Sequence, residues 1–346
     1  MNGLGKLIFL LPVIIIFSVS ACNSGSRQNE EEYNLVTAFT TTDREIRDNP
    51  EMRDEIADSL NRFLGSLNPA SVQGTNLIKN LIPVLQKPLV FEASYATVIV
   101  FDIALNEASG VTPDTLQIIR KLVLSKLYEA QTILESGGIE MTEREKEIYV
   151  EDLGINITYL ESPYARTELI GYPSPEINFL WCSDGVSKGL TDFKNKVVVL
   201  DFWATWCAPC INTFPDLRRL QERYDGYPVV IVGITSIQGY HNDIKNRQRY
   251  DTKGNPDAET GYMAAFMKDM EMTWQVAFSE TNVFSPDFGV RLIPHISIID
   301  AAGIVRYNAL RPDGAPYHEA DKIDALLKEA GLPFPSQPMK RDNIAN

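Results

Sequence analysis

Cysteine and histidine are scarce in this sequence. Its 346 residues include only four cysteines and three histidines, and none of them lies between Tyr33 and Arg166. A chain of this length can bury enough apolar surface to fold without disulfide staples. The cysteines are therefore expected to serve chemistry, and the stretch from Tyr33 to Arg166 can contribute neither thiol nor imidazole to it.

Positive charge is also in deficit. The chain carries 32 Lys and Arg residues against 46 Asp and Glu residues, a formal net charge of −14. A protein that neutralises a phosphate backbone needs the opposite balance, so nucleic acid is excluded as an expected partner. Hydrophobic residues make up 44% of the chain and charged residues 23%, which is typical of globular proteins, and the length suits about two domains.

Long apolar runs are absent except at the N-terminus. Lys6 precedes an apolar run over residues 7–19, and small residues follow directly before Cys22. The run is shorter than the roughly 20 residues that a membrane-spanning helix needs. Residues 1–21 are therefore predicted to be a signal peptide, with ordinary secretory cleavage after Ala21 or an uncleaved anchor as the alternatives.

The residues at the end of this run, "VSAC", resemble the lipobox of bacterial lipoproteins. The resemblance implies that Cys22 is acylated, that the chain is lipid-anchored in the bacterial cell envelope, and that it faces the periplasm. Asn23 favours the outer membrane by resemblance to bacterial sorting rules. Residues 22–32 are polar and acidic and are predicted to be a flexible tether.

Residues 33–165 are predicted to form an all-helical domain of unknown role. Apolar residues recur every three to four positions, most clearly between Thr112 and Gly137. Weaker patterns predict helices over 51–64, 92–107 and 142–150. Nothing in this half indicates a function beyond a scaffold or a partner-docking module.

Prolines near Ala165 mark a predicted boundary, beyond which residues 166–335 have an α/β pattern and residues 336–346 a tail. Buried strands are expected at "KVVVLDFW" and "PVVIVGIT", and a hairpin at "HISIID" and "IVRYN". Helices are expected over 207–224 and 256–272 and at "HEADKIDALLKEAG". The predicted architecture is a central mixed sheet flanked by helices.

Cys207 and Cys210 occupy the transition from the strand "VVVLDF" to the following helix. Unpaired backbone N–H groups at a helix N-terminus stabilise a thiolate, so the pKa of Cys207 is expected below the roughly 8.5 of an ordinary thiol. Cys210 lies one turn deeper and is close enough to form a disulfide with Cys207. Pro209 is tolerated in the first turn, where its missing N–H has no helical partner. Asp201 is interpreted as a buried acid with a raised pKa, although a merely structural carboxylate is the alternative.

Residues 201–210, "DFWATWCAPC", resemble the active-site signature of thioredoxin-fold oxidoreductases, and residues 172–332 are similar to membrane-tethered proteins of the TlpA and ResA type. The resemblance implies a thioredoxin fold, with residues 175–196 as a hairpin before its core. It implies the following site residues: Cys207 and Cys210 as the redox pair, Asp201 as proton carrier for Cys210, Pro215 as the helix kink, Pro294 as a cis-proline, and Trp206, Pro209, Ile293 and Pro294 as substrate-binding residues.

The predicted function is an extracytoplasmic thiol–disulfide oxidoreductase that reduces protein disulfides and is recharged by a membrane electron donor. No cofactor is expected beyond the cysteine pair itself. A thiol peroxidase of the peroxiredoxin type is one alternative, although Leu200 and Ala204 stand where its usual Pro and Thr would precede Cys207. A non-catalytic binding lipoprotein is the other alternative.

A structural zinc site is the alternative interpretation of two cysteines at this spacing. It would need two further ligands, which Cys182 and one of His241, His295 and His318 could supply. Trp206 and Pro209 would have no role in such a site, so no metal is predicted. Cys182 is interpreted as a small core residue. His295 could either tune the thiolate or simply begin a strand.

Overall fold

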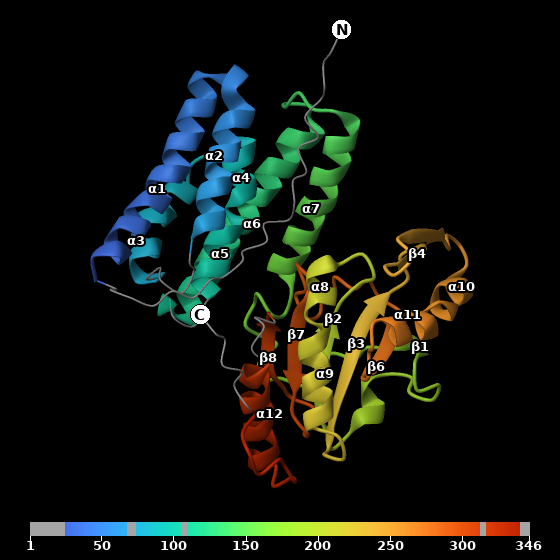
Figure 1. The fold of residues 1–346 in the computed structure, drawn as a ribbon. Helices are drawn as coiled ribbons and strands as arrows, with labels where there is room; N and C mark the ends of the chain where they lie inside the picture. Colours follow the sequence, from blue (N-terminus) through green and yellow to red (C-terminus); the bar gives the residue numbers. More distant parts are fainter. Residues whose placement is uncertain (1–24, 68–73, 106–108, 312–315, 340–346) are drawn as a thin grey trace. The chain divides into compact units, whose positions relative to one another are not determined.

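The computed structural model describes residues 25–67, 74–105, 109–311 and 316–339 (Figure 1). The chain divides into two compact units between Leu160 and Glu161, close to the boundary predicted near Ala165. The predicted signal peptide and Cys22 lie outside the described residues.

The described part of the first unit is helical, as predicted. Its helices are α1 (Gly25–Asp48), η1 (Pro50–Met52), α2 (Arg53–Ser66), α3 (Gly74–Leu85), α4 (Phe91–Ala96), α5 (Val98–Leu105), α6 (Pro113–Glu135) and α7 (Glu143–Glu161), the last of which ends one residue beyond the boundary. Helix α6 packs against α3, α4 and α5. Fully buried side chains such as Phe39, Phe101 and Leu127 form the core of the unit. Thr112 caps α6 by accepting the N–H of Thr115, as its position predicted.

The tether predicted over residues 22–32 is wrong from Gly25 onward, because α1 begins there. Residues 25–32 include one arginine, one glutamine and three glutamates, all of which have high helix propensity. Its polarity argued against burial, but polarity alone does not prevent a helix.

Two predicted helices of this unit have different extents in the structure. Helix α7 continues eleven residues beyond the end predicted at Val150, because buried residues such as Leu153 and Leu160 extend its apolar face. The helix predicted over 92–107 is two helices, α4 and α5. Thr97 separates them, and its side chain donates to the carbonyl of Ser94 at 2.6 Å.

A mixed six-stranded sheet forms the second unit, in the order β1-β6-β3-β2-β7-β8. The strands are β1 (Phe179–Cys182), β2 (Val197–Phe202), β3 (Val229–Ser236), β6 (Gln275–Ser279), β7 (His295–Ile299) and β8 (Val305–Leu310). Strands β2, β3 and β6 are parallel, whereas β1, β7 and β8 run antiparallel to their neighbours. Helices η4 (Leu190–Phe193), α8 (Ala208–Asn212), α9 (Phe214–Arg223), α10 (Pro256–Gly261), α11 (Met263–Asp269) and α12 (Tyr317–Glu329) complete the unit. The predicted mixed sheet with flanking helices is confirmed.

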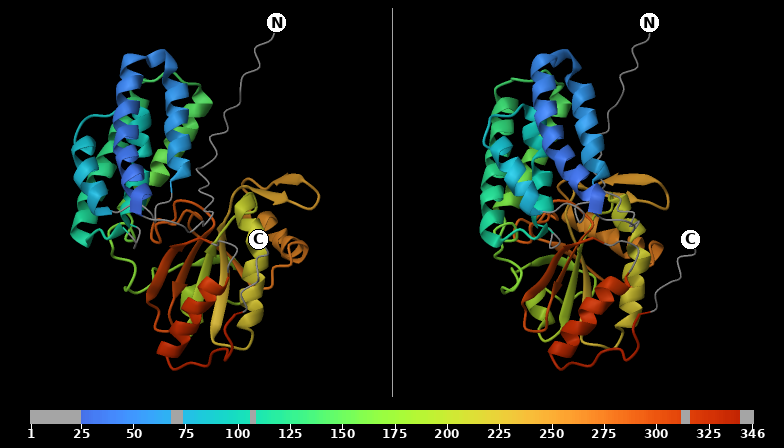
Figure 2. Two further views of the ribbon diagram at one scale, coloured as in Figure 1. Left: turned by 60° about the vertical axis from the view of Figure 1, so that its left-hand side comes forward. Right: turned by 90° about the vertical axis from the view of Figure 1, so that its left-hand side faces the viewer.

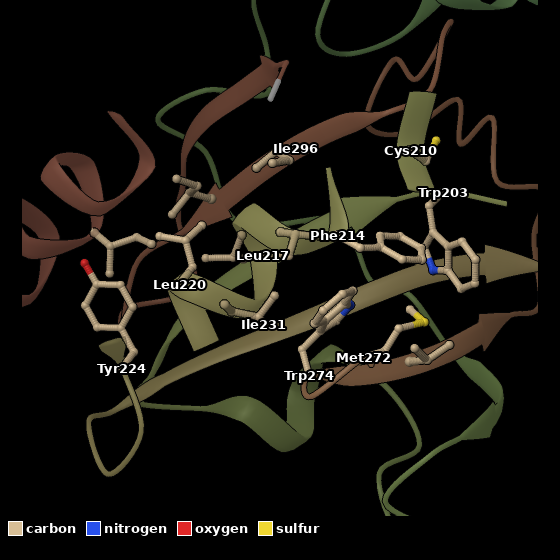
Figure 3. Packing of buried hydrophobic residues seen from close by; sticks show 14 of the residues in the cluster. Trp203, Cys210, Phe214, Leu217, Leu220, Tyr224, Ile231, Met272, Trp274 and Ile296 are labelled. Carbon is tan, nitrogen blue, oxygen red and sulfur yellow. The ribbon is translucent and has the colours of Figure 1, made fainter. Parts of the chain in front are cut away.

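Two apolar clusters lie on opposite faces of this sheet. Successive side chains of a strand point to opposite faces. On β2, Val197 and Val199 accordingly belong to one cluster and Val198 and Leu200 to the other. The first cluster includes residues of α9, α11 and α12 together with Cys207 and Cys210, and Figure 3 shows part of it.

The helix predicted over 207–224 is interrupted at Thr213, which separates α8 from α9. Pro215 has no N–H to donate to the carbonyl of Ile211, so a continuous α-helix cannot form across this point. The expected interruption of the helix near Pro215 is confirmed, but it occurs at Thr213, two residues before the proline.

The segment between β3 and β7 is richer in structure than predicted. One helix was expected over 256–272, whereas the structure has α10 and α11. A two-stranded hairpin, β4 (Tyr240–Asp243) and β5 (Gln248–Asp251), was not predicted, nor was β6. Strand β1 pairs with β6, while the hairpin implied over 175–196 closes through a single bridge, Asn178 to Gly189.

Candidate active site: the Cys207–Cys210 pair

Strand β2 delivers the two cysteines to one end of the sheet. Cys207 is the N-cap of α8, and its sulfur accepts the backbone N–H of Cys210 at 3.2 Å. The two residues form a disulfide with a Cα–Cα distance of 5.3 Å. Cys207 is 3% exposed and Cys210 is 0% exposed, so Cys210 is the more sheltered of the pair, as predicted. A sulfur anion at Cys207 would face an N–H donor that is already aimed at it.

Asp201 lies on the same face of the sheet as the cysteines, because it follows Val199 by two residues on β2 and Val199 belongs to the cluster that contains both cysteines. Its carboxyl group is fully buried, and neither oxygen has a hydrogen-bond partner among the described residues. Burial raises the pKa of Asp201 to about 7, because the ionised form loses its hydration. The complete burial of this carboxyl agrees with the predicted upward shift of its pKa, and a group with this pKa can gain or lose a proton near neutral pH.

Two tryptophans pack over the glycine that pairs with Asp201. Gly233 pairs directly with Asp201 across β2 and β3. A Cβ at Gly233 would come within 2.8 Å of Nε1 of Trp203 and 3.2 Å of Nε1 of Trp274. The glycine therefore leaves the space that the two indoles occupy. Figure 3 shows both indoles against the ring of Phe214, whose centroid lies 5.3 Å from each of them.

The substrate-binding residues implied by the resemblance gather at the same end of the sheet. The peptide bond between Ile293 and Pro294 is cis, as expected. His295 follows Pro294 and pairs with Phe202, the last residue of β2. The loop of Ile293 and Pro294 therefore lies at the end of the sheet where β2 leads into the cysteines. Trp206 is 38% exposed, and its indole N–H donates to Oε1 of Gln238 at 3.0 Å.

His295 does not face the cysteine pair. It pairs with Phe202, and both rings lie on the opposite face of the sheet, with their centroids 5.5 Å apart. Its Nε2 lies 3.0 Å from Oδ1 of Asn308, whose amide nitrogen donates to the carbonyl of Phe288. Burial lowers the pKa of His295 to about 4. Of the two interpretations of His295, the structure favours the start of a strand.

Cys182 is likewise separated from the redox pair. It is 5% exposed and packs in the cluster on the far face of the sheet. Burial raises the pKa of its thiol to about 11, so it is a poor nucleophile at neutral pH. The interpretation of Cys182 as a core residue agrees with this placement.

The structure does not assemble the alternative zinc site. Across the described ranges, no three His, Cys, Asp or Glu side chains gather closely enough to hold a metal ion. His241 stacks instead on Tyr262, with ring centroids 5.0 Å apart.

Sequence reasoning missed Gln238 and Glu259. Gln238 holds Trp206, and the buried carboxylate of Glu259 accepts the backbone N–H of Gln238 at 2.7 Å. Neither residue belongs to a recognisable motif. The only signal near them is Asn255 before Pro256, a helix start that places Glu259 in the first turn of α10.

Fold and site together define a class: the second unit has a thioredoxin-like fold, with a Cys207–Cys210 disulfide where a strand leads into a helix. Residues 170–327 match the family model described as Redoxin. This match covers less than half of the chain and leaves the helical unit outside it.

Relatives with related descriptions align with the same half. The thioredoxin-like protein YneN of Bacillus subtilis is 27% identical over 137 residues, which cover 39% of this chain and 68% of the relative. The thiol–disulfide oxidoreductase ResA of Bacillus cereus is 24% identical over 152 residues, which cover 44% of this chain and 76% of the relative.

Solved structures also align with this half. One is the thioredoxin domain of a thiol–disulfide oxidoreductase from Bacteroides vulgatus, with 20% identity, a TM-score of 0.33, and coverage of 44% of this chain and 96% of that one. A thiol:disulfide interchange protein from Chlorobium tepidum has 21% identity, a TM-score of 0.33, and coverage of 46% of this chain and 97% of that one.

Proposed function

We propose that this protein reduces disulfide bonds of exported proteins through the Cys207–Cys210 dithiol. The thiolate of Cys207 attacks one sulfur of the substrate disulfide, forms a mixed disulfide, and releases the other sulfur as a thiolate that takes up a proton. The thiolate of Cys210 then attacks Cys207 and releases the second substrate thiol. Two electrons pass to the substrate, and the Cys207–Cys210 disulfide remains.

Asp201 serves this cycle as the proton carrier of Cys210. Cys210 is fully buried and must lose its proton before it can attack. A carboxylate with a pKa of about 7 on the same face of the sheet can accept that proton near neutral pH. The observation that carries the proposal is a disulfide whose first cysteine caps a helix, together with a buried acid that has no hydrogen-bond partner among the described residues.

A substrate strand is proposed to bind along the loop of Ile293 and Pro294, with Trp206 and Pro209 as its other contacts. Backbone groups beside the cis-proline would pair with an extended peptide, a form of recognition that tolerates many sequences. Because each turnover leaves the pair oxidised, the proposal includes a membrane-bound dithiol donor that reduces it again. No other cofactor is proposed.

The proposed location is the periplasmic side of the bacterial envelope, with the outer membrane favoured. The signal-like segment and the cysteine that follows it support this location. None of the described helices is both long and apolar enough to cross a membrane. We expect incorporation of labelled fatty acid into the wild-type protein and none into Cys22→Ser; equal labelling of both would contradict lipid attachment at Cys22.

Reduction of insulin disulfides tests the proposed activity. The reduced protein, with dithiothreitol as electron source, should precipitate insulin chains at least about tenfold faster than dithiothreitol alone, since a stabilised thiolate reacts as the ionised form. Cys182→Ser serves as the matched control and should react as fast as the wild type, because Cys182 packs on the far face of the sheet. A wild-type rate equal to that of dithiothreitol alone would contradict the proposal.

A further inference from the structure

The hairpin β4–β5 is fixed to the domain along one of its faces. His241 and Tyr250 pair across the hairpin and point the same way. The ring of Tyr262, between α10 and α11, stacks on both, with centroid distances of 5.0 Å to His241 and 4.8 Å to Tyr250. The ring of His241 also contacts Phe266 edge-on at 5.5 Å. The hairpin is therefore a docked element with a defined outward face.

A buried carboxylate closes the base of the hairpin. Glu259 is 2% exposed and accepts three hydrogen bonds. The donors are the backbone N–H of Gln238 at 2.7 Å, the backbone N–H of Gly239 at 2.9 Å and the hydroxyl of Thr252 at 2.7 Å. Gly239 precedes the hairpin and Thr252 follows it, so one side chain holds both of its ends together.

The same base holds the residue next to the reactive cysteine. The indole N–H of Trp206 donates to Oε1 of Gln238 at 3.0 Å. The amide nitrogen of Gln238 in turn donates to the carbonyl of Ser236 at 3.0 Å and to its hydroxyl at 2.9 Å. Since β2 and β3 are parallel, the loops that follow them lie at the same edge of the sheet. Figures 1 and 2 show the hairpin at the end of the sheet where α8 begins.

Positive charge gathers on the hairpin and its turn, although the whole chain has a net charge of −14. Residues 240–254 include four basic and two acidic side chains. These are Lys245, Arg247, Arg249 and Lys253, which are exposed, and Asp243 and Asp251.

Local contacts orient part of this charge. The guanidinium of Arg249 lies 3.5 Å from the centroid of the Tyr240 ring on the outward face. Lys245 forms an ion pair with Asp269 at 2.7 Å, and Asp243 accepts hydrogen bonds from Asn246. Arg247 stands at the turn with a positive φ of 53°. Arg247 and Arg249 are thus the cations best placed to meet a partner.

We propose that the hairpin β4–β5 is a docking element that selects protein disulfides flanked by acidic residues. Carboxylates of the substrate bind Arg247 and Arg249, while the Gln238–Glu259 base keeps the hairpin in register with Trp206 and Cys207. This inference rests on the proposed reductase function and adds to it the chemical class of the preferred substrate. The hairpin that recognises the substrate and the Trp206–Cys207 segment that reacts with it are both tied to the hydrogen bonds of Gln238 and Glu259.

Two synthetic peptides test this docking. Both contain one intramolecular disulfide in the same sequence, flanked by four glutamates in one and four lysines in the other. At low ionic strength the wild-type protein should have a kcat/KM about tenfold higher for the acidic peptide, within the range by which complementary charge accelerates association. The preference should fall to less than about twofold at 1 M salt, where the Debye length is only about 3 Å.

Charge reversal locates the preference on the hairpin. Arg247→Glu with Arg249→Glu should abolish or invert the preference, and Arg247→Glu alone, which keeps the Tyr240 contact, should reduce it. The double variant Lys194→Glu with Lys196→Glu is the matched control, because these exposed lysines precede β2 and so lie at the opposite end of the strands. This variant should keep the preference for the acidic peptide. Unchanged thermal unfolding of each variant verifies that the fold is intact.

The outcomes separate the two proposals. Reduction of both peptides by the wild type at equal kcat/KM, or a preference that survives the double reversal on the hairpin, overturns the docking element alone. A wild-type protein that reduces neither peptide overturns the proposed reductase function, and the docking proposal falls with it.

Discussion

The Cys207→Ser variant should reduce insulin no faster than the assay does without protein. The nucleophile of the proposed reaction is the Cys207 sulfur, and a hydroxyl group is not ionised at neutral pH and cannot form a disulfide. After the dithiothreitol background is subtracted, the protein-dependent rate should fall on the order of 10⁴-fold or more, the scale on which enzymes lose rate when a covalent nucleophile is removed. A variant that retains a tenth of the wild-type rate above that background would contradict the assignment of Cys207.

The Cys210→Ser variant should instead stop the reaction at the mixed disulfide. Cys207 can still attack, but no second thiol resolves the mixed disulfide, so a covalent complex with the substrate should accumulate. Non-reducing electrophoresis followed by mass spectrometry should identify peptides linked to Cys207. The same trapping with Cys210→Ser and Cys182→Ser combined would exclude the third thiol. Equal trapping by Cys207→Ser would contradict the order of attack, in which the 3% exposed Cys207 precedes the fully buried Cys210.

The redox half of the chain was predictable because its signals are local and dense. The apolar runs of β2 and β3 predict strands buried on both faces, and both are buried in this way over most of their length. The burial of Asp201 follows from its place inside such a run. Its raised pKa then follows from burial alone, which is why sequence and structure agree on it. Its role in proton transfer stays a prediction.

What escaped prediction depends on contacts between distant residues. Strands β4 and β5 have polar sequences, and the hairpin is docked by rings of His241 and Tyr250 that pack on Tyr262. Only the fold reveals that Glu259 joins the two ends of the hairpin. The face on which His295 lies is set by its pairing with Phe202, a register that the single strand does not reveal. The sequence therefore indicated the reacting groups, Cys207, Cys210 and Asp201, but not the residues that position the neighbouring segments, such as Gln238 and Glu259.

The free energy of unfolding of the Asp201→Asn variant should lack the pH dependence that Asp201 gives to the wild type. The pKa of Asp201 is about 7 in the folded protein against an ordinary 3.8, so the folded state binds a proton more tightly than the unfolded state does. The stabilising contribution of the protonated group is fully present below about pH 3.8 and is lost as the pH rises through 7. The wild type should lose up to about 4 kcal/mol over this window, since one pKa unit corresponds to about 1.4 kcal/mol.

Urea unfolding of the oxidised protein between pH 4 and pH 8 measures this difference. Asp201→Asn cannot ionise, so its stability relative to the wild type should rise with pH and level off above pH 7 to 8. Asp287→Asn, at an exposed position of the same unit, is the matched control and should follow the wild-type profile. Parallel profiles for Asp201→Asn and the wild type would show that the buried carboxyl does not titrate in this window.

The same substitution should slow the second half of the catalytic cycle. Asparagine cannot accept the proton of Cys210, so release of the mixed disulfide should fall by about 10²-fold, the lower range for loss of a general base. In the wild type this step should accelerate with pH through an inflection near 7, as the carboxylate form of Asp201 increases. The inflection should be absent from Asp201→Asn, whereas formation of the mixed disulfide by Cys207 should keep its rate. Rapid-quench analysis separates the two steps, and an inflection that persists in Asp201→Asn would assign the proton transfer to another group.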